Sequence, residues 1–539
     1  MPASGGPRTL RAAAVRGRTD PFGGSASAIC HQVPQPRSVP MRLSDLAMHV
    51  PDAVLNTGGG DYDVRRVVHD SRHARPGDLF VAVRGLRADG HDYVSCLARE
   101  GIAVAVERTV PLPAGAPVLR LPDTRTGLAE LAAVLHGRPA RELLVTGVTG
   151  TAGKTTTTHM TAHILTAAGT PAGYLSTVAH GTGSSAKDNR SGQTTMAAPD
   201  NQAWLARMVA RRMRAAVVET SSHALEQGRV AACDFDVAAY TNIGADHLDY
   251  HGTWENYFLA KTRLMELTAR AVDKGVPKTT VINRDDPSWE ALSAHCLTER
   301  RLTYGIEHPA DVRATNVSVG RSDVRFVMRT FAGSAHVRLE LPALFNVRNA
   351  LCAAASCLAL GVPVEAVADA LARFEGVRGR LQRVDQGQPF DVYIDFAHSS
   401  LRLRTVLGEL RSKTPGRLIA VFGTTGRADH DPAGMGRAAA QHADFFIITT
   451  DDPAGEDPGD LAEQVESGVK GRRRGTDYEV ILDRRTAIWR AVEMAQPGDV
   501  VILAGKGPER TMLLADGPVP WDERAEVETA LRELGRAIA

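Results

Sequence analysis

A turn rich in glycine and threonine, with a single lysine, is the part of this sequence whose residue types most directly suggest chemistry. It is Gly147-Val148-Thr149-Gly150-Thr151-Ala152-Gly153-Lys154-Thr155-Thr156, with strand-type apolar residues before it and a helical pattern after it. Backbone N–H groups of such a turn face an anion, the lysine adds positive charge, and a threonine hydroxyl can ligate Mg²⁺. The pattern predicts a nucleotide-phosphate site. Val148 stands where the strict phosphate-loop pattern has glycine, so a purely structural turn is the alternative.

Acidic and imidazole side chains follow two other predicted strands. Glu219 ends the apolar run 215–219, and His247 follows the run 237–243. Because ligands of a parallel sheet bind beyond the carboxyl ends of its strands, both side chains fall near the phosphate turn. A carboxylate and the Thr155 hydroxyl suit Mg²⁺, which is a hard cation. The alternative is a zinc cluster, disfavoured because its histidines lack the glutamate of a metalloprotease helix. That cluster would use Asp246, His247, Asp249 and His251.

Lysine is scarce in this chain, with eight in all, and three of them stand in patterned polar segments. Besides Lys154, Lys261 lies in the predicted helix 255–267, and Lys506 follows an apolar strand within residues 504–509. These three are therefore candidates for chemistry. On spacing alone, an ordinary loop is the alternative for residues 504–509.

Strand and helix patterns alternate along most of the chain, which predicts an α/β fold with parallel sheets. We expect a disordered tail over residues 1–40, where Pro, Gly, Ser and Ala dominate, because such a composition buries little apolar surface. Three units are expected after it, over residues 41–141, 142–376 and 377–539. In the last unit, strand-like segments at 390–397, 417–423, 443–451, 478–482 and 499–505 predict a doubly wound sheet. Translation could begin at Met1 or at Met41, where patterned sequence starts.

The overall composition excludes several classes of protein. The 539 residues suggest three or four domains, and 43 % hydrophobic with 23 % charged residues is ordinary for globular protein. A net charge of +1 argues against nucleic acid or a membrane surface as partner. The six cysteines form no C-x-x-C pair, so neither a disulfide framework nor a structural zinc site is indicated. No apolar run is long enough to span a bilayer. We expect a cytoplasmic monomer, although the sequence leaves the oligomeric state undecided.

Together these motifs resemble the Mur ligase family, and within it the UDP-N-acetylmuramoyl-tripeptide synthetase (MurE) type. The resemblance covers about residues 42–539. Its most specific motifs are the phosphate turn, the segment from Glu219 to Val230, and Asp246-His247-Leu248-Asp249-Tyr250-His251-Gly252. Further matches are residues 70–72, 76–80 and 345–351, Gly379-Arg380, Asp395-x-Ala397-His398, and residues 504–509.

This resemblance implies a three-domain enzyme: a UDP-substrate-binding domain, a central ATPase of phosphate-loop type, and a Rossmann-like amino-acid domain that closes over the others. The implied reaction is ATP-driven amide formation. A carboxylate of the UDP-linked muramoyl-peptide attacks the γ-phosphate of ATP, and the amine of an amino acid then displaces phosphate from the acyl phosphate. Such a reaction requires that the protein stabilise the charge on the transferred phosphoryl group, and it does not require covalent catalysis. The implied cofactors are ATP and Mg²⁺.

The resemblance also implies roles for individual residues. The implied ATP contacts are Gly150, Thr151, Gly153, Lys154, Thr155, Thr156, Asn346, Asn349, Arg380 and Asp395. The implied catalytic residues are Lys154, Lys261, His247 and Arg380. The implied metal ligands are Thr155, Glu219, His247 and Lys261, the last as its carbamate (N6-carboxylysine). The UDP-sugar and peptide would be held by Ser71, Thr194, Thr195, Ser221, Gln227 and Arg229, and the amino acid by Asp451, Asp452, Gly505 and Glu509.

The chain departs from the family pattern mainly in its amino-acid half. The motif Asp-Asn-Pro-Arg of diaminopimelate-adding members is Asp451-Asp452-Pro453-Ala454 here, which removes a bidentate partner for a second substrate carboxylate. Pro508 replaces a histidine, and a basic loop is altered at residues 427–433. In the nucleotide and sugar half, Ala152 replaces the usual asparagine and Met196 a proline.

We therefore predict an ATP-dependent acid–amino acid ligase, most simply one that extends UDP-N-acetylmuramoyl-dipeptide in peptidoglycan precursor synthesis. A paralogue that joins an amino acid to another carboxylate in a specialised pathway is the first alternative. A nucleotide-binding protein without ligase activity is the second. The sequence does not identify the amino acid that is added.

Overall fold

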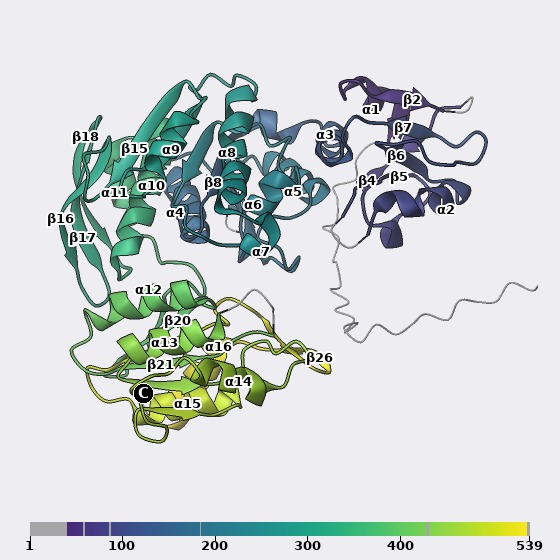
Figure 1. The fold of residues 1–539 in the computed structure, drawn as a ribbon. Coiled ribbons are helices and arrows are strands. Elements are labelled where there is room, and N and C mark those ends of the chain that lie inside the picture. Colours follow the sequence, from purple (N-terminus) through teal and green to yellow (C-terminus); the bar gives the residue numbers. More distant parts are fainter. Residues whose placement is uncertain (1–39, 58–59, 86–87, 184, 427–430, 536–539) are drawn as a thin grey trace, which may run out of the picture.

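The computed structural model describes residues 40–57, 60–85, 88–183, 185–426 and 431–535. Their helices and strands form three α/β units in chain order, which Figure 1 shows in purple, in blue to green, and in green to yellow. Nearly all of the predicted tail (residues 1–39) and residues 427–430 of the altered loop lie outside the described residues. Among the described helices, none has the length and apolar character to cross a membrane.

The N-terminal unit is built on a five-stranded sheet with the order β2-β7-β6-β5-β4. Its strands are β2 (Val54–Asn56), β4 (Arg66–Val68), β5 (Asp78–Val81), β6 (Ala103–Val106) and β7 (Val118–Arg120), and β1 (Met41–Arg42) pairs separately with β3 (Asp63–Val64). Alternate residues of β5 face opposite sides of the sheet, because side chains alternate along a strand. Leu79 packs with α1 (Leu43–Met48) and α3 (Thr124–Leu135), whereas Phe80 packs with α2 (Val94–Arg99).

The central unit contains an 11-stranded sheet with the order β11-β10-β9-β12-β8-β13-β14-β15-β16-β17-β18. Its middle strands are β8 (Leu144–Thr149), β9 (Ala172–Leu175), β12 (Ala215–Glu219), β13 (Val237–Tyr240), β14 (Thr279–Asn283) and β15 (Arg300–Gly305), all paired in parallel. One face is covered by α4 (Lys154–Ala167), α10 (Leu344–Ala359) and α11 (Val364–Leu371), and the other by α5 (Ala198–Ala210) and α8 (Trp254–Arg270).

Both edges of the central sheet are antiparallel, which the alternation of strands and helices did not predict. At one edge β10 (Ala179–Thr182) and β11 (Ser185–Asp188) form a hairpin. At the other, β16 (Val312–Val319), β17 (Val324–Thr330) and β18 (Gly333–Leu339) form a meander. Connections this short allow only antiparallel pairing, because a parallel crossover needs a dozen or more residues.

The C-terminal unit is a doubly wound six-stranded sheet with the order β19-β20-β24-β21-β22-β23, as predicted. Its strands are β19 (Gln382–Val384), β20 (Asp391–Asp395), β21 (Leu418–Phe422), β22 (Phe445–Ile448), β23 (Tyr478–Val480) and β24 (Val500–Ala504). One face carries α12 (Ser400–Arg411), α13 (Pro432–His442) and α14 (Pro458–Glu466), and the other carries α15 (Arg484–Met494) and α16 (Glu523–Glu533).

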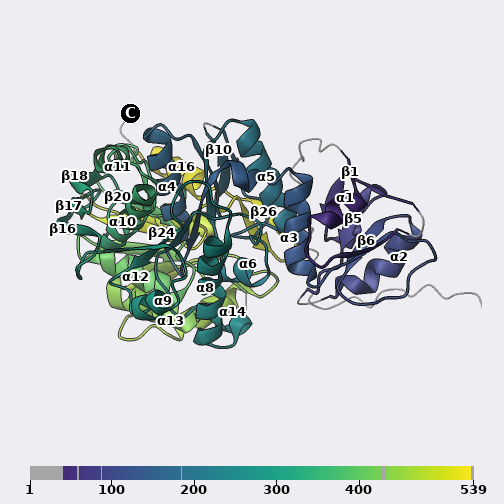
Figure 2. The ribbon, with the colours of Figure 1, turned by 90° about the horizontal axis from the view of Figure 1, so that it is seen from above.

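Salt bridges join the central and C-terminal units, which are adjacent in Figure 1 and overlap when seen from above in Figure 2. Asp188, at the end of β11, pairs with Arg378 at 2.9 Å and with Arg510 at 3.6 Å. Arg321, before β17, pairs with Asp391 of β20 at 2.6 Å. The C-terminal unit therefore lies against the edges of the central sheet.

Candidate functional site

The predicted phosphate turn joins β8 to α4 at the carboxyl edge of the central sheet. Two of its positions require glycine. Gly150 and Gly153 both have positive φ, and a Cβ would collide with the Thr241 hydroxyl at Gly150 and with the Asn349 side-chain oxygen at Gly153. The turn is thus held in one shape by close packing, and its N–H groups lead directly into the N-terminus of α4.

Two lysines converge on the carbonyl groups of this turn. The Lys154 ammonium donates to the carbonyl oxygens of Gly150 at 2.9 Å and Thr151 at 3.0 Å, and burial lowers its pKa to about 8. The Lys261 ammonium, which is almost completely buried, donates to the same Gly150 oxygen at 2.9 Å. Burial, and then the neighbouring Lys154, keep the Lys261 pKa well below its usual value.

A hydroxyl, a carboxylate and a guanidinium meet at the first turn of α4. The Thr155 hydroxyl donates to Glu219 at 3.0 Å, and Glu219 also accepts from the backbone N–H of Thr177 at 2.8 Å. Arg380, from the C-terminal unit, lies over the Phe396 ring and reaches the Thr155 hydroxyl at 3.3 Å. The site is therefore assembled from two units of the chain.

The remaining predicted nucleotide residues surround this centre. Asn346 and Asn349 bond to each other at 3.2 Å on α10, and the Asn349 side chain faces Gly153. Asp395 ends β20, accepts from the backbone N–H of Leu381 at 2.7 Å, and has a pKa raised by burial. Thr156 is buried in α4.

His247 lies at the N-terminal end of the short helix α7 (Leu248–His251), with its ring 4.8 Å from that of His223. In the described part of the chain, the only group of three metal-type ligands within reach of one another is Asp451, Asp452 and Glu509. The alternative zinc cluster at residues 246–251 is thus not assembled.

Four of the six residues predicted to hold the sugar and peptide form a hydrogen-bonded network. The Thr195 hydroxyl accepts from the backbone N–H of Ser221 at 3.0 Å, and Arg229 donates to the Thr195 carbonyl at 2.9 Å. Arg229 also donates to the Gln227 side chain at 2.6 Å. Thr194 is the chain neighbour of Thr195. Ser71 lies in the N-terminal unit, at the start of the 3₁₀ helix Ser71–His73, and the structure gives no contact from it to the network.

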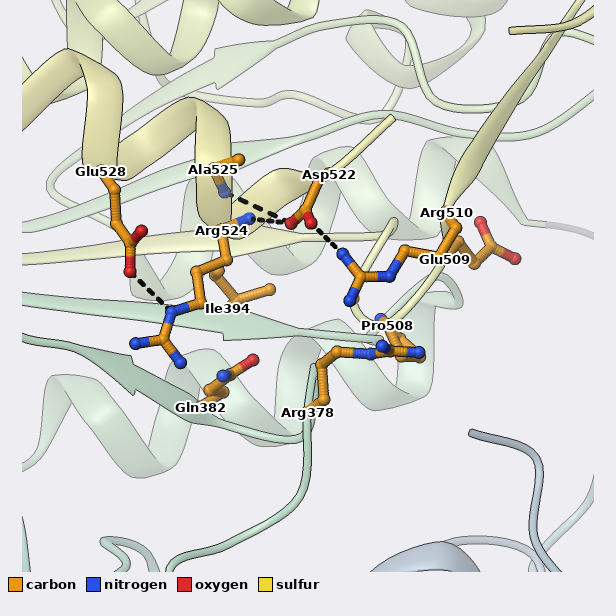
Figure 3. Close-up of a pocket in the computed structure, with 11 residues that line it drawn as sticks. Arg378, Gln382, Ile394, Pro508, Glu509, Arg510, Asp522, Arg524, Ala525 and Glu528 are labelled. Carbon is orange, nitrogen blue, oxygen red and sulfur yellow. Dashed lines mark hydrogen bonds and ion pairs between the residues drawn. The ribbon is translucent and has the colours of Figure 1, made fainter. Parts of the chain in front are cut away.

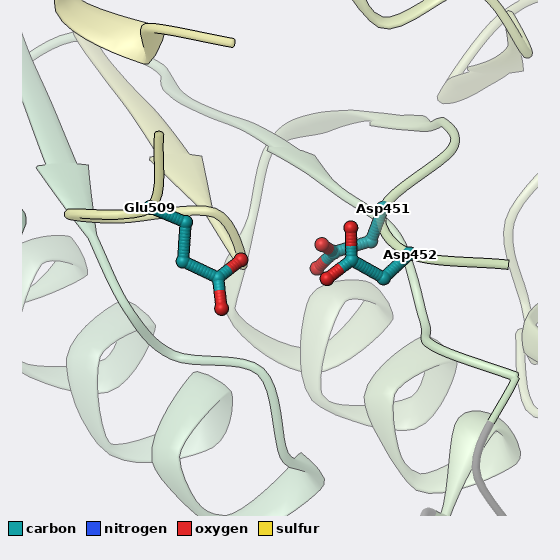
Figure 4. A group of neighbouring side chains, drawn as sticks. All are labelled: Asp451, Asp452 and Glu509. Carbon is teal, nitrogen blue, oxygen red and sulfur yellow. The ribbon is translucent and has the colours of Figure 1, made fainter. Parts of the chain in front are cut away.

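The predicted amino-acid residues gather at the carboxyl ends of β22 and β24, and Figure 4 shows the three acidic ones, which surround a buried lysine. The Lys506 ammonium lies 2.7 Å from Asp452, 2.5 Å from Glu509 and 3.8 Å from Asp451. Burial raises the pKa of Asp451 to about 7, and its Oδ2 atom has no hydrogen-bond partner. The Asp451 carboxylate leaves no room for a Cβ at Gly505.

A separate cavity of about 340 Å³, which Glu509 helps to line, lies between β19 and the N-terminal end of α16 (Figure 3). Its arginines are already paired: Arg524 with Glu528 at 2.7 Å, Arg510 with Asp522, and Arg378 with Asp188 at 2.9 Å. The cavity contains none of the residues predicted for a ligand except Glu509, and its paired charges leave no excess for one.

Comparisons with known proteins match this arrangement. Residues 63–135 match the Mur ligase family catalytic domain, residues 148–357 the Mur ligase middle domain, and residues 379–507 the Mur ligase glutamate ligase domain. A UDP-N-acetylmuramyl-tripeptide synthetase of Roseiflexus sp. (strain RS-1) is 40 % identical over 511 residues, covering 92 % of this chain and 99 % of the relative. The chain belongs to the Mur ligase family. It is accordingly an ATP-dependent ligase that forms amide bonds.

Other Mur ligases resemble it over their full length. A UDP-N-acetylmuramoyl-L-alanyl-D-glutamate–2,6-diaminopimelate ligase of Geobacillus thermodenitrificans is 38 % identical, covering 92 % of this chain and all of that protein. A solved structure of a ligase with the same name matches with a TM-score of 0.64 at 28 % identity, covering 88 % of this chain and 96 % of that one. MurF from Thermotoga maritima, solved with ADP, has the same fold at a TM-score of 0.58 and 19 % identity, over 88 % of this chain and 98 % of that one.

Two residues of the site carry more contacts than the sequence predicted. Lys506 was singled out, but not as the centre of the acidic group. Arg402, on α12, was not singled out, yet its guanidinium reaches the Thr151 carbonyl at 3.4 Å and Asp246 at 3.3 Å. The only local signal is a cation in the first turn of a helix, where cations are unfavourable.

Proposed function

We propose that this Mur ligase joins an amino acid to UDP-N-acetylmuramoyl-dipeptide through an acyl phosphate, in peptidoglycan precursor synthesis in the cytoplasm. The observation that carries the proposal is the convergence of Lys154, Thr155, Glu219, Lys261 and Arg380 on one glycine-rich turn. The names of full-length relatives support the choice of substrate.

We propose that the three units, about residues 41–141, 142–376 and 377–539, each bind a different substrate. The first would bind the UDP moiety, the second ATP and the third the amino acid. All the proposed site residues come from one chain, so a second copy is not needed, and we propose that the protein acts as a monomer.

In the proposed reaction, the phosphate turn and α4 N-terminus bind the ATP phosphates, and Lys154 and Arg380 stabilise the negative charge that develops on the transferred phosphoryl group. Thr195, Ser221, Gln227 and Arg229 would position the muramoyl-peptide carboxylate beside it. Asp451, Asp452 and Glu509 would orient the incoming amine. These residues bind and align the reactants, and no covalent bond to the protein is required.

Mg²⁺ fits the donor atoms at the first turn of α4. The Thr155 hydroxyl and Glu219 carboxylate are oxygen ligands only 3.0 Å apart, and Mg²⁺ characteristically adds water and phosphate oxygens to a few protein ligands. We propose Thr155, Glu219 and His247 as its ligands. When bound, Mg²⁺ would neutralise phosphate charge. Lys261 is proposed to hold a second Mg²⁺ as a carbamate, because its lowered pKa favours the neutral amine that reacts with CO₂.

The amino acid is proposed to carry a neutral or cationic side chain. Ala454 offers no cation to a second carboxylate, and the acidic residues around Lys506 repel one. A side-chain ammonium would instead be attracted.

The experiment that tests the function is phosphate release from ATP with a panel of amino acids, with and without UDP-N-acetylmuramoyl-dipeptide. We expect release to require both the dipeptide substrate and an amine, with an amide product of matching mass. Small carboxylic acids replace the dipeptide in a parallel panel. Turnover with one of these acids, and none with the dipeptide, would favour a specialised paralogue. Phosphate release that depends on neither the carboxylate substrate nor the amino acid would contradict a ligase.

A further inference from the structure

One guanidinium beside the phosphate turn has no role in the function proposed above. It belongs to Arg402, in the first turn of α12 on the C-terminal unit. Figure 1 shows α12 on the side of that unit that faces the central unit. The Arg402 Nη2 atom lies 3.4 Å from the Thr151 carbonyl oxygen and 3.3 Å from the Asp246 carboxylate, with about a quarter (26 %) of the side chain exposed.

The same Thr151 carbonyl also accepts from the Lys154 ammonium at 3.0 Å, and the neighbouring Gly150 carbonyl accepts from both Lys154 and Lys261 at 2.9 Å. Three basic side chains thus share two adjacent carbonyl oxygens, and two of them, Lys154 and Arg402, are cationic. Like charges at such distances repel each other unless anions lie among them. Asp246 compensates one of them, so the group retains an attraction for a further, multiply charged anion.

The position of Arg402 is not explained by the stability of its own helix. A cation in the first turn opposes the helix macrodipole, and that turn contains no acidic residue to offset it. Arg404, two residues further along α12, is exposed instead. Only Arg402 points from α12 to the phosphate turn, through contacts that join two units of the chain.

We propose that Arg402 binds the terminal phosphates of ATP. In the absence of nucleotide it pairs with Asp246, and it moves to the phosphate oxygens when ATP fills the turn. A planar guanidinium offers two parallel N–H donors that match two phosphate oxygens. Arg380 reaches the turn at Thr155 and Arg402 at Thr151, so the C-terminal unit supplies a guanidinium at each place. The proposal rests on the placement of ATP at residues 147–156.

The test is isothermal titration calorimetry of the full chain with ATP, ADP and AMP. In Arg402→Ala, ATP affinity should fall by about ten- to a hundred-fold, the range for loss of a hydrogen bond to a charged group. ADP should lose less, and AMP should bind as it does to the unmodified protein. Arg402→Lys keeps the charge without the planar fork and should recover part of the ATP affinity. Arg404→Ala, on the same helix, is the matched control and should leave all three affinities unchanged.

Two results would overturn the proposal. The first is unchanged ATP affinity in Arg402→Ala, and the second is an equal loss for all three nucleotides, which would mean that Arg402 only holds the two units together through Asp246. Retained AMP binding shows that the variant is folded, and should Arg402→Ala not fold, Arg402→Lys decides by the same ATP-to-AMP ratio. If the unmodified protein bound no ATP, the assignment of the nucleotide site itself would be wrong. That outcome differs from one in which the unmodified protein and Arg402→Ala bind ATP with equal affinity, which would contradict only the role of Arg402.

Discussion

Discrimination against a second substrate carboxylate is the prediction that most directly tests the amino-acid site. Three carboxylates, from Asp451, Asp452 and Glu509, surround the single Lys506 ammonium. Even with Asp451 partly protonated, at a pKa of about 7, the three carboxylates carry at least one negative charge more than the Lys506 ammonium balances at neutral pH. At an effective dielectric constant of about 20, a substrate carboxylate about 6 Å from this charge is repelled by about 3 kcal/mol, roughly a hundred-fold in affinity.

The assay is the ratio of kcat/KM for meso-diaminopimelate to that for L-lysine. In the unmodified protein we expect a ratio of about 0.01 or lower. The negative charge of the acidic residues repels the second carboxylate of diaminopimelate, whereas it attracts the side-chain ammonium of lysine. Ala454→Arg should raise the ratio at least about ten-fold, because a charge-assisted bidentate pair contributes 1.5 kcal/mol or more. Ala454→Gln adds similar bulk without charge and should change the ratio little.

Two relatives, 38 % and 37 % identical to this chain, are named diaminopimelate ligases, so the ratio tests whether this chain differs from them. A ratio above one in the unmodified protein would refute the reasoning. An equal effect of Ala454→Arg and Ala454→Gln would refute the assignment of charge as its cause.

Three further predictions concern the nucleotide site. Lys154→Ala should abolish amide product while the thermal melting curve stays close to that of the unmodified protein, and near-native turnover would contradict the site. Lys261→Ala should be inactive and partly rescued by formate or acetate, which can replace the carbamate; full activity without rescue would exclude that role. ATP affinity, measured by calorimetry, should change little from pH 7 to 7.5. It should then fall about ten-fold per pH unit above the Lys154 pKa of about 8, because the bound phosphates require the protonated ammonium. A flat profile to pH 9.5 would contradict this.

The elements that hold the phosphate turn were predictable because their signals are local. Apolar strand residues, two glycines and a lysine at fixed spacing define β8, the turn and the start of α4 without reference to the rest of the chain. Five of the six strands of the C-terminal sheet, all except β19, were predicted for the same reason. Their apolar runs are bounded by turn residues, and β20, β21, β22 and β24 are buried on both faces.

The antiparallel edges and the contacts between units were not predicted. In β17 the signal was present: Val324, Phe326 and Met328 are buried and alternate with more exposed residues, the period of a half-buried strand. In β11 it was missing, because all four residues are exposed. Arg402 meets the turn 251 positions away in sequence. No local sequence pattern predicts a contact of this kind, because it depends on how two units of the chain pack against each other.

The placement of the acidic group has a consequence for how new specificities arise. Asp451, Asp452, Gly505 and Glu509 all follow two strands of one sheet, β22 and β24, which are separated by β21, and the chain enters that sheet only after residue 377. Substitutions in these two loops change the charge presented to the amine while the glycine-rich turn, more than 290 positions earlier, is left as it was. Evolution and protein engineering can therefore exchange the nucleophile of the reaction independently of its energy source, by grafting two short loops.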